Sequence, residues 1–137
     1  MSKGNTTEGD ILSQIFTDVA VPWAAATDIE IHLHTADPGE GGTTATNECT
    51  YTNYAAASVT RGLAGWTVSG AAPTQAANDA LIQFPQCGVT GNTITHVSVS
   101  WNGSTQILYS GALNAPLAVA NLIQPQFAIS ALVITED

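Results

Sequence analysis

Positive charge is what this sequence has least of, because only two of its 137 residues, Lys3 and Arg61, are basic. Nucleic-acid-binding proteins neutralise phosphates with clustered lysine and arginine side chains, and anionic membranes attract the same charges. Two isolated cations in a chain of net charge −9 supply neither kind of surface. We therefore expect no nucleic acid and no membrane as a direct partner.

Long apolar runs and closely spaced cysteines are also missing. No stretch approaches the roughly 18 apolar residues of a membrane-spanning helix, and no apolar segment of a secretion signal follows Met1. Cys49 and Cys87 lie far apart and form no Cys-x-x-Cys pair. We expect both thiols to stay reduced, in a protein made in a cytoplasm.

Known catalytic and phosphate-binding motifs are absent as well. The sequence contains no Gly-x-Ser-x-Gly, His-Glu-x-x-His or P-loop pattern, and two basic residues leave little for phosphoryl transfer. The acids Asp37, Glu40 and Glu48 lie in a Gly/Thr-rich stretch, without the apolar surroundings that separate the pKa values of a catalytic carboxylate pair. We therefore predict that the protein is not an enzyme and needs no cofactor.

The chain does contain enough apolar material for one folded domain. Hydrophobic residues make up 45% of it, and chains of this length bury most of their apolar surface without disulfides or metal. No repeat, linker or shift in composition divides the sequence. We predict a single domain over residues 1–137.

One amphipathic helix is expected near the N-terminus, over residues 8–20. Thr7 and Asp10 resemble a capping box, and Pro22 is expected to end the helix. The apolar stripe consists of Ile11, Leu12, Ile15, Phe16 and Val19. We expect this stripe to lie on an open edge or end of the domain, with the surface of a partner as the alternative.

Residues 28–134 are dominated by short runs typical of β-strands. Strict alternation marks 28–34 and 93–101, Asn102-Gly103 is a strong hairpin signal, and 70–78 is expected to be a loop. The connections are too short for crossover helices, so the sheets should be antiparallel. The sequence thus predicts a mainly β fold, an antiparallel β-sandwich or flattened barrel of about 7–8 strands with one N-terminal helix.

Polar residues alternate along the strand expected at 28–34, so that Glu30, His32 and His34 share one face. His-x-His on a strand is a metal-ligand spacing, and His96 would add a ligand from a neighbouring strand. The same alternation arises when a half-buried strand turns its polar face towards solvent or another subunit. We favour this second interpretation and predict no metal site.

Two segments are predicted to contact other proteins. The first contributes Ile11 and Ile15 of the helix together with Trp23, for which packing within its own domain is the alternative. The second is the long loop of residues 35–50, because loops of this length in compact domains are often functional. Its acids and the preceding histidines complete the predicted interface, which comprises Asp37, Glu40, Glu48, His32 and His34.

Several short motifs follow one another along the chain. They are Ile31–Pro38 (IHLHTADP), Glu48, Tyr54-Ala55-Ala56, Leu81–Pro85, Thr95-His96-Val97, Gly111-Ala112-Leu113 and the closing strand Phe127–Ile134. With this order, nearly the whole chain resembles the small virion proteins of tailed bacteriophages that are often labelled tail-fibre-like. Ala56 replaces an arginine of that family, and Val97–Ser100 replaces a more apolar run, so no role of that arginine is carried over.

The resemblance implies a non-enzymatic virion component made in the cytoplasm of a host bacterium. A compact acidic domain without a fibrous repeat suits a clamp on a shell with local threefold axes better than a fibre shaft. We therefore predict a capsid decoration (cement) protein, a trimer on the outer head surface that binds the major capsid protein or other virion proteins. The first alternative is a tail-associated adaptor or fibre-base component, and the second is a metal-dependent enzyme or carbohydrate-binding sandwich.

Overall fold

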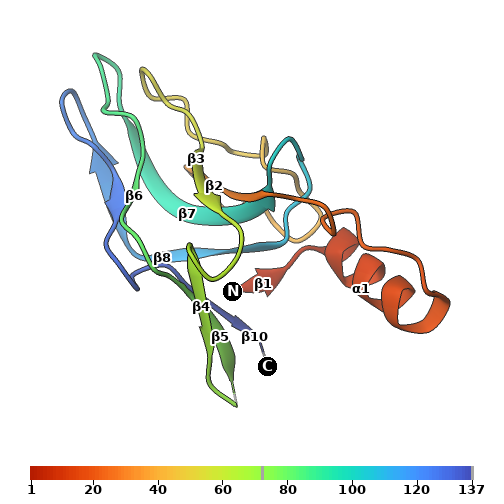
Figure 1. Ribbon diagram of the computed structural model, residues 1–137. Coiled ribbons are helices and arrows are strands. Elements are labelled where there is room, and N and C mark those ends of the chain that lie inside the picture. Colours follow the sequence, from red (N-terminus) through yellow and green to blue (C-terminus); the bar gives the residue numbers. More distant parts are fainter. Residues whose placement is uncertain (72, 137) are drawn as a thin grey trace.

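The computed structural model describes residues 1–71 and 73–136, which form a helix and three antiparallel β-sheets (Figure 1). The five-stranded sheet contains, in spatial order, β1 (Ser2–Lys3), β8 (Tyr109–Val119), β7 (Asn92–Trp101), β2 (Asp28–His34) and β3 (Ala57–Thr60). The three-stranded sheet contains β10 (Val133–Glu136), β5 (Thr74–Asn78) and β4 (Trp66–Ser69), and β6 (Ile82–Gln83) pairs with β9 (Gln126–Phe127).

This architecture confirms the predicted mainly β fold with antiparallel sheets and one N-terminal helix, α1 (Asn5–Thr17). Among the described residues the sheets stay open and form no closed barrel. Residues 1–71 and 73–136 contain ten strands instead of seven or eight, because β1, β6 and β9 are two-residue strands and because residues 74–78 form β5 instead of a loop. No helix in the described ranges is both long and apolar enough to cross a bilayer.

The core lies against one face of the β2–β7 ladder. Directly opposed residues of an antiparallel pair share a face, and Ile31 pairs with Val99 and Leu33 with Val97. These four side chains are buried together with Tyr51, Phe84, Cys87, Ile94 and Leu132. The alternation of residues 28–34 predicts that one face of this strand is apolar and buried, and the burial of Ile31 and Leu33 confirms this prediction.

A buried asparagine ties the two smaller sheets together. Asn78 Nδ2 donates to the carbonyl oxygens of Ala80 and Ala128, at 2.7 and 2.8 Å, and Asn78 Oδ1 accepts from the Leu132 amide at 2.9 Å. The Asn78 side chain is fully buried, and so is Leu132, so the Leu132 amide would lose this partner without gaining water. One side chain thus fixes the end of β5 against the β9–β10 connection.

The helix lies three residues earlier than predicted at both ends. It begins at Asn5, after Gly4 in an extended conformation, and the buried Thr7 does not cap it because its Oγ1 donates to the Ile107 carbonyl, 2.8 Å away. It ends at Thr17, and the next residue, Asp18, has a left-handed φ of 57°, a conformation that aspartate adopts more readily than most residues. The predicted capping box and the role of Pro22 as terminator were therefore wrong.

Replacing the buried asparagine should cost much of the stability of the domain. We expect Asn78→Ala to lower the free energy of unfolding by about 2 kcal/mol, because the buried Leu132 amide loses its acceptor and the Ala80 and Ala128 carbonyls lose a donor. Chemical denaturation followed by tryptophan fluorescence measures the effect. The control is Asn121→Ala, at an exposed asparagine, for which we expect a change within about 0.5 kcal/mol; equal losses for the two variants would contradict the role of Asn78.

Candidate interaction surface

The first turn of α1 is firmly attached to the β-structure. The Gly4 amide donates to the Leu108 carbonyl at 3.1 Å, and the Asn5 amide donates to the Glu40 carbonyl at 2.9 Å. A Cβ at Gly4 would lie only 2.3 Å from the Ile107 carbonyl oxygen, so glycine is needed for this close approach. Gln106 Nε2 adds hydrogen bonds to Thr7 Oγ1 and Asp10 Oδ2, at 3.0 and 2.8 Å.

The remainder of α1 projects away from the sheets (Figure 1). Leu12, Ile15 and Phe16 are 57%, 65% and 78% exposed, and Val19 beyond the helix end is also exposed. The expectation that the domain itself covers the helical stripe is therefore wrong for most of its length. Only Ile11, at the anchored end, is half-buried. An apolar face of this size on a small domain is typical of a surface that meets another protein.

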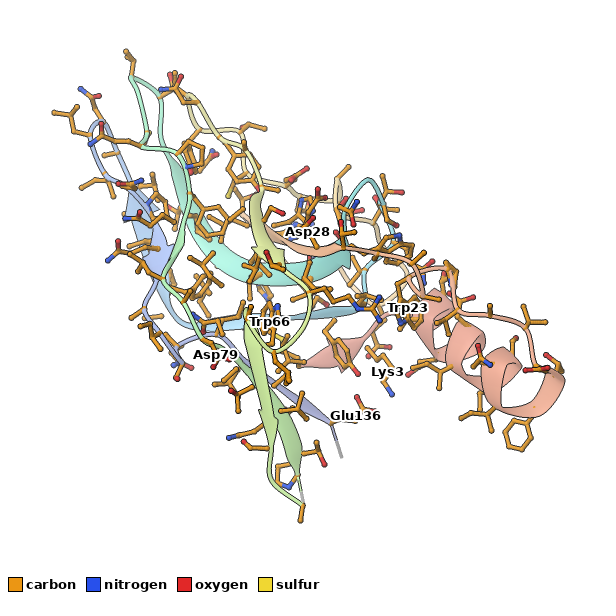
Figure 2. The ribbon with its side chains drawn as sticks, in the orientation of Figure 1. Lys3, Trp23, Asp28, Trp66, Asp79 and Glu136 are labelled. Carbon is orange, nitrogen blue, oxygen red and sulfur yellow. The ribbon has the colours of Figure 1, made fainter. Side chains whose placement is uncertain are left out.

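Trp23 lies on the chain that returns from α1 to β2, and it packs within its own domain. Its ring centroid lies 5.7 Å from that of Trp101, with the planes tilted by 51°. The backbone here is held by Arg61, whose guanidinium donates to the carbonyl oxygens of Trp23, Ala24 and Ala26 at 2.5 to 3.2 Å. Trp23 is half-buried and lies between α1 and the five-stranded sheet (Figure 2).

Two apolar grooves meet beside the helix. The first, of about 310 Å³, lies between α1 and the body and is lined by Ile11, Ile15, Val21 and Trp23 among others. The second, of about 490 Å³, lies over the three-stranded sheet and is lined chiefly by Ile29, Leu63, Trp66, Val68, Ala76 and Ile134. Leu108 and Tyr109 line both grooves, so the apolar surface is continuous from the helix to β4.

The predicted loop of residues 35–50 separates its acids between two environments. Asp37 and Glu40 are exposed, and Asp37 Oδ1 accepts from the Gly39 amide at 2.8 Å. Glu48 instead turns towards the sheet, where its Oε1 lies 2.7 Å from Nδ1 of His32 and 3.0 Å from the hydroxyl of Tyr54. Asp37 and Glu40 are therefore accessible to a partner, whereas Glu48 is hydrogen-bonded within the domain.

His32 and His34 are buried, contrary to the prediction that they face outwards. The reason is that the loop folds over the polar face of β2, so both faces of this strand are covered. His34 Nδ1 donates to the Thr46 carbonyl at 2.9 Å, and its Nε2 accepts from the Ser98 hydroxyl at 2.7 Å. His32 is held in the same way, with Nδ1 on Glu48 and Nε2 at 3.2 Å from Ser100 Oγ.

Tyr54 completes this buried network by accepting the Leu33 amide hydrogen, because the pairing of β2 with β3 ends at Ile31. Its hydroxyl accepts from the Leu33 amide at 2.9 Å and donates to Glu48. Burial raises the pKa of Tyr54 well above its usual range, so the hydroxyl keeps the proton it donates. Among the described residues, no group of three His, Cys, Asp or Glu side chains is arranged to hold a metal ion.

Ser100, His32 and Glu48 have the order of a serine-hydrolase triad, at 3.2 and 2.7 Å. A nucleophilic serine must be reached by its substrate, yet Ser100 is fully buried. Neither groove described above is lined by any of the three residues. We interpret the arrangement as a structural network that ties the loop to the sheet.

Comparison with known protein families identifies the family of the chain. Residues 2–135 match the family described as Podophage GP4 fiber I protein gp80. The chain belongs to this family. The predicted membership in a tail-fibre-like family of phage virion structural proteins is thereby confirmed, and the chain is a virion component that interacts with other virion proteins. No curated protein matches the chain.

The burial of Ser100 predicts that it does not react. We expect a fluorophosphonate probe, which labels activated serines, to leave the folded protein unlabelled while it labels a serine hydrolase treated in parallel. Intact-protein mass spectrometry measures the adduct. Labelling that disappears in Ser100→Ala would show that the triad is accessible and would contradict the structural interpretation.

The buried His34 predicts that acid destabilises the fold. Burial lowers the pKa of His34, outweighing the Thr46 carbonyl and the Glu48 carboxylate, which raise it; His32 and His96 lower it further. The unfolded chain therefore takes up the proton at higher pH than the folded chain, so this contribution to stability is lost as pH falls below the ordinary histidine value of about 6.5.

Urea denaturation at pH 7, 6 and 5 tests this expectation in the wild type and in His34→Gln. The difference in stability between the two proteins should narrow towards pH 5, by at most about 1.4 kcal/mol per pH unit, the limit for one group. A difference that is constant or that grows on acidification would contradict the assigned direction.

Proposed function

We propose that this chain is a non-enzymatic structural subunit of the fibre apparatus of a short-tailed phage and works by docking against other virion proteins. The observation that carries the proposal is the exposed apolar face of α1, which lies beside the apolar groove of the domain. An exposed apolar face costs solubility unless it is covered in an assembly. The fibre in the family description supports the location.

The side chains available at the surface also support a docking role. With His32 and His34 buried, the exposed surface carries small polar residues, isolated acids and apolar side chains, among them those of α1 and of the groove beside it. Interfaces between proteins draw their affinity from such apolar and aromatic centres. The predicted interface residues Ile11, Ile15 and Trp23 line this groove, whereas Asp37 and Glu40 offer a second, acidic contact.

The outer head surface, which the sequence led us to predict ahead of a tail location, is the second candidate. The compact shape of the domain favours it, because the described residues contain short strands and one helix of 13 residues, without an extended shaft. In that location the partner would be the major capsid protein, and the acidic charge would face outwards. The two locations share the same docking chemistry and differ in the partner.

Labelling of intact virions distinguishes these locations. We expect gold-conjugated antibodies raised against the purified chain to mark the tail region of the particle in electron micrographs. Pre-immune serum is the control, and mass spectrometry of purified virions establishes that the chain is present. Label spread over the head would replace the fibre location with head decoration, and absence of the chain from virions would contradict both.

A further inference from the structure

We infer that the exposed face of α1 from one copy docks in the apolar groove of a second copy of the same chain. The inference deepens the proposed function, because it names the first partner of the docking surface. It rests on three features of the described residues: the shape of the groove, the spacing of apolar side chains on the helix, and the distribution of charge between them.

The groove is open and apolar in a single copy. Leu63, in the turn between β3 and β4, is 93% exposed, and Val68 on β4 is 68% exposed. Trp66 and Ile134 line the same groove. Covering these side chains removes apolar surface from water, which is the main driving force for association.

The helix presents the spacing that such a groove accepts. Leu12, Ile15 and Phe16 occupy positions i, i+3 and i+4, which is the pattern of helices that bind in apolar grooves. Ile11 and Ile15 already line the groove beside their own helix. Leu12 and Phe16 lie about 100° further round the helix, so they are free to enter a different molecule.

Charge favours a second copy of this chain as the occupant. Residues 4–26 carry three acids, Glu8, Asp10 and Asp18, and no base. Both bases of the chain lie at the groove, since Arg61 lines it and Lys3 pairs with Glu136, which lines it too (Figure 2). Within the described ranges no carboxylate pairs with Arg61. The rest of this acidic surface would repel the helix, whereas the Arg61 end attracts it.

Because of the way α1 is attached, its exposed face can enter the groove of another copy but not the groove of its own chain. Its first turn is fixed by hydrogen bonds to Glu40, Ile107 and Leu108, so the projecting half cannot fold back over its own three-stranded sheet. A helix that enters a groove elsewhere on the neighbouring copy makes a head-to-tail contact, which must close into a ring to remain finite. The trimer predicted from the sequence is such a ring.

Self-association of the purified chain tests the inference. We expect the wild type to sediment as a closed oligomer, and Leu12→Ser/Phe16→Ser to dissociate at least tenfold more readily. The control is Val89→Ser, an 87% exposed residue in the β6–β7 connection, which lies at the opposite end of the molecule from α1 (Figure 1). Circular dichroism verifies that each variant is folded.

Cross-linking tests the pairing itself. Phe16→Cys and Leu63→Cys are prepared as separate proteins, and the native thiols of Cys49 and Cys87 are buried. A short bismaleimide should link the two variants only when they are mixed. Efficient linking of Phe16→Cys to itself would indicate helix-to-helix packing and would overturn the proposed pairing.

The remaining outcomes are equally decisive. A chain that stays monomeric at micromolar concentrations, or an oligomer unaffected by Leu12→Ser/Phe16→Ser, would overturn the inference. Binding of monomeric chain through α1 to a different virion protein would also overturn it, yet would leave the proposed function intact. Absence of the chain from virions would instead contradict the proposed function, whatever the oligomeric state.

Discussion

Coverage of both faces of the β2–β7 ladder is the constraint on which the rest of the structure depends. One face carries Ile31 and Leu33 into the apolar core. The other carries His32 and His34, whose ring nitrogens are all satisfied by the covering loop and by Ser98 and Ser100. Nearly all buried polar groups in native proteins are paired, so this network favours one position of the loop. The Glu40 carbonyl, to which the helix is attached, belongs to that same loop.

As a consequence, one side of the domain exposes apolar surface. The loop and residues 106–108 of the β7–β8 connection hold only the N-terminal part of α1, so the rest of the helix projects with Leu12 and Phe16 uncovered. Beside it lies an apolar groove that no segment of the described chain fills. An exposed apolar surface of this kind lowers the solubility of an isolated protein but stabilises a subunit that buries it in an assembly. This agrees with membership in a family of phage virion proteins.

The buried Ser100–His32–Glu48 arrangement illustrates why geometry alone does not make an active site. Its distances satisfy the hydrogen bonds of a triad, but its serine has no access to solvent. The proposed function therefore depends on apolar residues, which carry no reactive group, and not on these polar residues. Leu63 and Val68 were not recognised in the sequence, because single apolar residues in a turn and a short strand look no different from ordinary surface residues.

The amino-acid sequence by itself determined the fold class, the helix and strands of strong periodicity, and the family, since these depend on local alternation and on the order of motifs. Tertiary structure alone decided that residues 35–50 cover His32 and His34, because whether a polar strand face meets water or a loop depends on where a distant segment lies. It also decided that α1 stands clear of the sheets, since periodicity marks an apolar face without identifying what covers it.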